Sequence, residues 1–186
     1  MREWTWTGWR NAVLAAAALA VSGCTGVPEG VAPVTGFDPT RFSGTWYEIM
    51  RLDHTFESGL TNVRATYQPR PDGTVAVFNR AWNPTACAWE TVEGSARLRA
   101  GPDVGSFAVT LTSPFPGGLH VLALDHADYQ WALAGGPTRD FLWILSRTPT
   151  LDPEIRKALM RQARDMGYPV ADLVRVDQSG PVCESR

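Results

Sequence analysis

Two segments about a hundred residues apart constrain most strongly what this chain can fold into. Residues 42–47 read FSGTWY and residues 142–149 read LWILSRTP, and only short, β-rich segments lie between them. These segments are bounded by Gly, Pro and Asp, which predicts strands joined by turns. Regularly spaced short strands are typical of either a β-sandwich or an up-and-down barrel, and the pattern by itself leaves both folds open.

With the first segment, eight strands are expected, followed by one helix. The helix should be capped by Asp152, start at Pro153 and stop at Gly167, because these residue types favour those positions. A short last strand is expected at residues 173–176, beside the first. The remaining strands are expected at residues 63–67, 74–82, 90–99, 106–112, 119–124, 129–134 and 140–147.

The two opening segments resemble the signature of the lipocalins, in which Gly-X-Trp opens the first strand and an Arg closes the last long strand before a single helix. The resemblance selects the barrel and implies an all-β, eight-stranded antiparallel up-and-down lipocalin barrel with one C-terminal helix packed outside. It also implies that Trp46 and Arg147 close one end of the barrel as a pair. A guanidinium over an indole face contributes about 0.5–2 kcal/mol.

The resemblance is closest to bacterial outer-membrane lipocalins of the apolipoprotein D-like branch, and it covers residues 37–178. It is carried further by residues 56–63 (FESGLTNV), 79–84 (NRAWNP) and 123–125 (ALD), although residues 127–129 read ADY where lipocalins commonly have TDY. The implied function is to bind and store or transport lipids, such as lysophospholipids and fatty acids, for envelope maintenance.

The N-terminal residues read as a targeting segment. Residues 1–23 combine early arginines with an apolar run, which is typical of a secretory signal peptide. Residues 19–24 (LAVSGC) resemble the bacterial lipobox, which implies lipidation of Cys24. By the same resemblance, Thr25 rather than Asp after the cysteine favours the outer membrane, and we expect the protein to face the periplasm. The Gly/Pro-rich residues 24–36 predict a flexible tether, followed by the lipocalin domain at 37–178 and a C-terminal tail at 179–186.

With Cys24 assigned to the anchor, Cys87 and Cys183 remain in a compartment where disulfides persist. We predict that they pair, since many lipocalins tie the C-terminal tail to the barrel wall. Two unpaired thiols are the alternative.

Alternation along the strands predicts which side chains face a ligand. Leu142 and Ile144 should face outward under the helix, and small Gly94 and Ala96 should leave room inside. Residues 74–82 fit two phases, of which we choose the inward Asn79, because it matches a pocket asparagine of the apolipoprotein D-like lipocalins. Tyr67 is expected near the rim. The expected ligand-binding set is Tyr67, Asn79, Phe107, Val109, Phe141 and Trp143.

Charge and motif content narrow the function classes. The formal net charge is −2 with no basic cluster, so nucleic-acid binding lacks its electrostatic footprint. His54, His120 and His126 fall in no metal spacing or nucleophile elbow, so we expect no catalytic residue, metal or cofactor. The alternatives are a lipocalin-fold enzyme, a haem or tetrapyrrole carrier with His120 as axial ligand, and a lipid-anchored scaffold without a ligand. The expected partners are a small apolar ligand and the membrane, through acylated Cys24, with a homodimer as one option.

Overall fold

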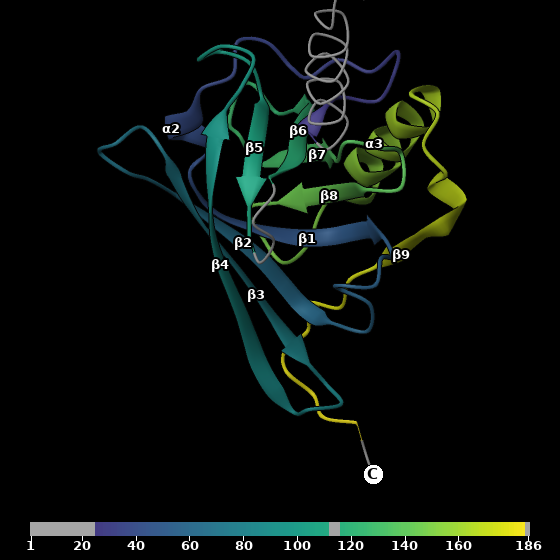
Figure 1. Cartoon of the computed structure of the whole chain (residues 1–186). Coiled ribbons are helices and arrows are strands. Elements are labelled where there is room, and N and C mark those ends of the chain that lie inside the picture. Colours follow the sequence, from purple (N-terminus) through teal and green to yellow (C-terminus); the bar gives the residue numbers. More distant parts are fainter. Residues whose placement is uncertain (1–24, 112–115, 185–186) are drawn as a thin grey trace, which may run out of the picture.

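The computed structural model describes residues 25–111 and 116–184, which form a closed antiparallel β-barrel with a helix outside it (Figure 1). The sheet order is β2-β3-β4-β5-β6-β7-β8-β1-β9, and β1 also pairs with β2, which closes the barrel. The eight-stranded lipocalin barrel and the extra last strand are thereby confirmed. The strands are β1 (Gly44–Leu52), β2 (Thr61–Pro69), β3 (Val75–Asn83), β4 (Ala88–Leu98), β5 (Ser106–Thr110), β6 (Gly117–Leu124), β7 (Trp131–Gly135), β8 (Leu142–Ser146) and β9 (Leu173–Arg175).

Strand β1 closes the barrel because it changes partners along its length. Its first half pairs with β2, with Trp46 opposite Ala65, and its second half pairs with β8, with Glu48 opposite Leu145. Its end also pairs with β9, where Leu52 lies opposite Leu173. Two short helices that the sequence did not predict, α2 (Pro39–Phe42) and η1 (Val170–Asp172), precede β1 and β9.

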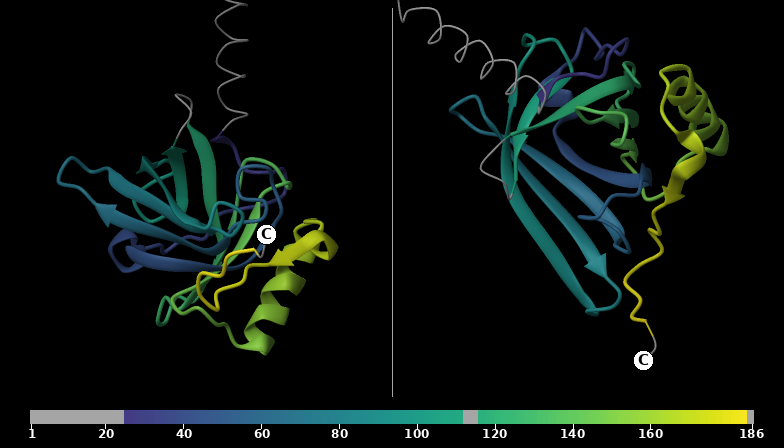
Figure 2. Two further views of the ribbon diagram at one scale, coloured as in Figure 1. Left: turned by 90° about the horizontal axis from the view of Figure 1, so that it is seen from below. Right: turned by 45° about the vertical axis from the view of Figure 1, so that its right-hand side comes forward.

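Helix α3 (Pro153–Asp165) packs against the outside of the barrel wall (Figure 2). The side chain of Asp152 caps it by accepting hydrogen bonds from the backbone N–H groups of Glu154 and Ile155, as expected for an N-cap. Leu159 and Ala163 are buried in one cluster with the outward Leu142 and Ile144 of β8. This packing explains why a barrel strand is apolar on both faces.

Strand β6 contains an irregularity that overturns part of the expected alternation. Its register against β7 shifts between Val121 and Ala123. Val121 and Leu124 therefore both belong to the barrel interior, whereas Ala123 packs into the cluster under α3. Strict alternation would place Ala123 on the same face as Leu119 and Val121, but a β-bulge inserts one residue and reverses the phase beyond it.

The described part of the expected tether, residues 25–36, lies along the barrel and contacts it. Val34 donates a backbone hydrogen bond to Val121 and accepts one from Gly105, and Val31 packs into the cluster under α3. The backbone of residues 25–36, which form no named strand, thus makes hydrogen bonds with β6 and with the loop before β5. The signal peptide and Cys24 lie outside the described residues.

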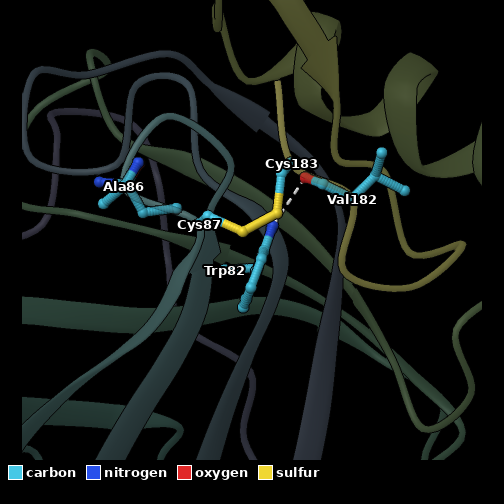
Figure 3. The surroundings of a disulfide bond; sticks show 6 residues. Trp82, Ala86, Cys87, Val182 and Cys183 are labelled. Atoms are coloured by element: carbon cyan, nitrogen blue, oxygen red, sulfur yellow. Dashed lines mark hydrogen bonds between the residues drawn. A yellow bond between two sulfur atoms is a disulfide. The ribbon is translucent and has the colours of Figure 1, made fainter. Parts of the chain in front are cut away.

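The C-terminal tail crosses the outside of the barrel and is joined to the β3–β4 turn (Figure 3). Cys87 and Cys183 form the predicted disulfide, with their Cα atoms 5.0 Å apart. Beside it, Trp82 donates a hydrogen bond from Nε1 to the carbonyl of Val182, at 2.8 Å. The outward Trp82 of the chosen β3 phase is therefore covered by the tail.

The disulfide should contribute strongly to stability, because it closes a loop with a sequence separation of 96. On the chain-entropy model a loop of that length stabilises the fold by about 4–5 kcal/mol. We expect the free energy of unfolding of the Cys87→Ala/Cys183→Ala variant, measured by urea titration, to be lower than that of wild type by that amount. Reduction should abolish the difference, and an unchanged unfolding midpoint in the variant would contradict the prediction.

Candidate ligand cavity

One end of the barrel is sealed by Trp46. Its side chain is fully buried, and its ring lies 4.9 Å from that of Phe42. Its Nε1 donates a hydrogen bond to the carbonyl of Phe42 at 2.8 Å, so the polar edge of the indole is satisfied. The guanidinium carbon of Arg147 lies 3.9 Å from the ring centroid, which is cation–π contact geometry.

The same guanidinium ties together three chain segments around the plug. Arg147 donates from Nη1 to the carbonyl of Thr45 at 3.0 Å, from Nη2 to that of Arg41 at 2.7 Å and from Nε to that of Tyr129 at 3.1 Å. Gly44 lies beside it with a φ of +94°, and a Cβ there would approach Nη1 to 3.4 Å. A glycine at the start of β1 thus permits the positive φ of this turn, while a Cβ at that distance would make only an ordinary contact with the arginine.

Above this plug the barrel encloses a cavity of about 620 Å³. Its wall is mainly apolar and contains a smaller number of polar and charged side chains. The apolar lining includes Val77, Val109, Leu111, Leu119, Ala134 and Leu145. Such a wall favours an apolar ligand, with the polar side chains fixing its orientation.

The structure brings most of the expected ligand-binding residues to this cavity. Tyr67, Asn79, Val109, Phe141 and Trp143 all line it. Tyr67, however, lies near the sealed end rather than at the rim. It pairs with Gly44 at the start of β1, and its ring is 5.3 Å from that of Phe42.

Two further expectations about the interior are corrected. Phe107 is inward and buried but does not line the cavity, because its ring packs against Phe37 and Phe42 at the sealed end. The room expected beside Gly94 is occupied by β5, where a Cβ would come within 2.1 Å of the carbonyl oxygen of Thr110. Gly94 therefore permits close approach of neighbouring strands and leaves no ligand space.

A buried polar cluster in the cavity wall was missed by the sequence analysis. Glu48 and Glu57 are only 6% and 7% exposed, and both line the cavity. Arg51 lies within ion-pair distance of both, with Nη1 at 3.6 Å from Glu48 Oε2 and Nε at 4.0 Å from Glu57 Oε2. The available signal was the alternation from Trp46 to Glu48, since an inward Trp46 places Glu48 inward as well.

Burial dominates the electrostatics of this cluster. It raises the pKa of Glu48 well above its ordinary value, and the negative charge of Glu57 raises it further, against the opposing effect of Arg51. Burial also raises the pKa of Glu57, although a hydrogen bond from Trp143 Nε1 at 3.3 Å acts in the other direction. One guanidinium thus does not fully compensate the desolvation of two carboxylates.

Comparison with known proteins agrees with this geometry. The family model of the lipocalin-like domain matches residues 37–178. This chain belongs to the lipocalin-like family. Lipocalins are carriers of small apolar ligands, and the barrel of this lipocalin contains a cavity with a mainly apolar wall.

Two curated relatives and one solved structure illustrate the similarity. Outer membrane lipoprotein Blc of Citrobacter freundii is 45% identical over 82% of this chain and 86% of its own length. The protein of the same name from Vibrio cholerae is 38% identical over 85% of this chain and 92% of its own. In fold, the major allergen Per a 4 from cockroaches matches with a TM-score of 0.65 at 19% identity, over 82% of this chain and 96% of that one.

His120, the expected axial ligand of the haem alternative, does not face the cavity of this lipocalin. It is fully buried on the outside of the wall, where Nδ1 lies 3.0 Å from Ser106 Oγ and Nε2 lies 2.7 Å from the carbonyl oxygen of Gly26. Both ring nitrogens are therefore engaged by the protein.

Residues 25–111 and 116–184 contain no helix of sufficient length and apolarity to span a membrane. Within the same ranges, no group of three or more His, Cys, Asp or Glu side chains is arranged to hold a metal ion.

Aromatic side chains gather where the cavity opens. The ring of His54 stacks on Phe56 at 4.1 Å and lies 5.3 Å from the rings of both Phe141 and Trp143. Burial and the positive charge of Arg51 lower the pKa of His54 to about 4, against the opposing effect of Asp53. His54 is therefore neutral at pH 7.

This shift makes the stability of the barrel depend on pH. The unfolded chain protonates His54 near pH 6.5 and the folded chain only near 4, so acidification between these values favours unfolding. We expect the free energy of unfolding of wild type to fall, relative to His54→Gln, as the pH drops from about 6.5 toward 4. Urea titrations of both proteins at the two ends of this window measure the difference. Parallel pH profiles would contradict the assignment.

Proposed function

We propose that this lipocalin is an outer-membrane lipoprotein that binds single-chain lipids, such as lysophospholipids and fatty acids, and stores or transports them for envelope maintenance. The observation that carries the proposal is the apolar cavity of about 620 Å³, sealed at one end by Trp46 and Arg147. Its volume falls in the range that buries small ligands. The naming of the relatives in Citrobacter freundii and Vibrio cholerae as outer membrane lipoproteins supports the location.

Binding of this kind needs burial and no chemical step. Apolar surface removed from water contributes about 25 cal/mol per Å², from which the costs of association are subtracted. An alkyl chain lying along Val77, Val109 and Leu145 would supply that surface. We therefore propose a carrier rather than an enzyme.

The carrier function predicts a one-to-one lipid complex that depends on the cavity aromatics. Native mass spectrometry of the detergent-free protein should show one adduct after addition of a lysophospholipid. Trp143→Ala should weaken binding about tenfold or more, because it removes a large apolar contact from the cavity.

The matched control is Trp89→Ala. Trp89 lies outside the barrel, between the guanidinium groups of Arg64 and Arg80. This variant should retain wild-type affinity. A folded protein that forms no adduct with any lipid would favour the scaffold alternative.

We propose further that Cys24 is diacylated on its sulfur, that it becomes the acylated N-terminus when residues 1–23 are removed as a signal peptide, and that the domain at 37–178 faces the periplasm. Several acyl chains on one residue anchor a protein far more firmly than one. The N-terminal lipobox resemblance supports this assignment, since small residues precede Cys24.

The anchor predicts that Cys24→Ser releases the protein from the membrane. Wild type should sediment with the outer membrane, whereas the variant should appear in the soluble periplasmic fraction without acyl mass on its N-terminal peptide. Ser22→Ala, which keeps a small residue before the cysteine, serves as the control and should remain anchored. A variant whose N-terminal peptide still carries acyl mass would rule out Cys24 as the acylated residue.

A further inference from the structure

The polar part of the cavity wall carries more negative than positive charge. Arg51 is the guanidinium of the cluster, and three carboxylates lie within 4.0 Å of it. Its nitrogens are 3.6 Å from Glu48, 3.6 Å from Asp53 and 4.0 Å from Glu57. Of these carboxylates, those of Glu48 and Glu57 line the cavity.

The arginine does not itself present a face to the cavity. Arg51 is buried behind the two carboxylates, and its Nη2 donates to the backbone carbonyls of Glu57 and Leu60. It is absent from the residues that line the cavity, whereas Glu48 and Glu57 are among them. Arg80 also lines the cavity, but from an exposed position on β3, whereas Glu48 and Glu57 are buried in the wall. A ligand in the buried part of the cavity therefore meets acceptor atoms before it meets the guanidinium of Arg51.

Two of these acceptors have no hydrogen-bond donor in the part of the chain that the structure describes. They are Glu48 Oε2 and Asn79 Oδ1, both buried. Glu48 is inward because it pairs with the inward Leu145 of β8, and Asn79 lines the same cavity from β3. Arg51 Nη1 lies 3.6 Å from Glu48 Oε2, beyond hydrogen-bond distance. A buried acceptor without a donor is unfavourable, and more so when it is charged, so a ligand that brings a donor to these atoms would gain affinity.

We propose that Glu48, Glu57 and Asn79 form a subsite for the protonated amino group of the ligand. This inference rests on the proposed carrier function and narrows its ligand class to single-chain amphiphiles with an ammonium group. An ammonium has three donors and no acceptor, which complements a wall of acceptors. Its charge would also compensate the carboxylates in a desolvated site, where charge-assisted hydrogen bonds are strong.

The same wall disfavours a free carboxylate at the polar end of the ligand. The carboxylate of such a ligand would lie against Glu48 and Glu57. It would bring further acceptor atoms to a wall whose own acceptors, Glu48 Oε2 and Asn79 Oδ1, lack a donor. Like charges brought together in a buried site favour the neutral forms and weaken binding. The subsite therefore discriminates between lipids that share the same alkyl chain.

Dodecylamine, dodecanol and dodecanoate test this discrimination, because they differ only in the polar group. The chain carrying Cys24→Ser, which needs no detergent, is titrated at pH 7 with each ligand, and displacement of a neutral apolar dye is followed. We expect dodecylamine to bind at least about tenfold more tightly than dodecanoate, since a hydrogen bond to a charged group contributes that much.

The variants assign the preference to the subsite. Glu48→Gln, which keeps the shape of the side chain, should weaken dodecylamine about tenfold and leave dodecanol unchanged. Glu57→Gln should act in the same direction, so that the test survives if one variant fails to fold. The matched control is Glu93→Gln, because Glu93 is exposed on β4 and does not line the cavity. This variant should prefer dodecylamine over dodecanoate as strongly as wild type does.

Each other outcome overturns a distinct statement. Equal or tighter binding of dodecanoate would mean that Arg51 receives the ligand, which overturns the ammonium subsite and leaves the carrier intact. A preference for dodecylamine that both glutamine variants retain would also overturn the subsite. Failure of all three ligands to displace the dye would overturn the carrier function itself.

Discussion

The contact between Arg147 and Trp46 is the interaction on which the rest of the barrel depends. A barrel needs a plug at one end if it is to hold a ligand without leaking water through. The indole supplies the plug, and the guanidinium covers its face while binding carbonyls from three segments, those of Arg41, Thr45 and Tyr129. Helix α2, the start of β1 and the loop before β7 are thereby held to the residue that follows β8.

Much of this end could be predicted from the sequence, because local chemistry determines it. Trp46 opens the first strand, Arg147 closes the last long strand, and outward Leu142 and Ile144 require a cover that α3 supplies. The errors arose where position depends on non-local geometry. A bulge after Val121 reversed the phase of Ala123, and the approach of β5 took the space expected at Gly94. Neither the bulge in β6 nor the distance between β4 and β5 can be deduced from the residue types at these positions.

The cluster of Glu48, Arg51 and Glu57 was missed for a different reason. In a sequence, a charged residue inside a strand reads as a solvent-facing position unless its partner is known, and Glu57 comes from the loop after β1. Burying these groups costs stability that an apolar core would have kept. Charge kept in a cavity wall at that cost is typical of a site that recognises a polar group.

Contacts of the C-terminal residues on the outside of the barrel hold the cluster of Glu48, Arg51 and Glu57 in place. Gln178, in the tail that Cys183 ties to Cys87, donates from Nε2 to the backbone carbonyls of Glu48 at 2.8 Å and Val63 at 2.9 Å. The tail thus bridges β1 and β2 directly behind the carboxylate of Glu48. Since β1 leaves β2 for β8 at this level, these hydrogen bonds join the two strands where their own ladder ends. The disulfide consequently fixes the cavity wall from outside as well as the tail.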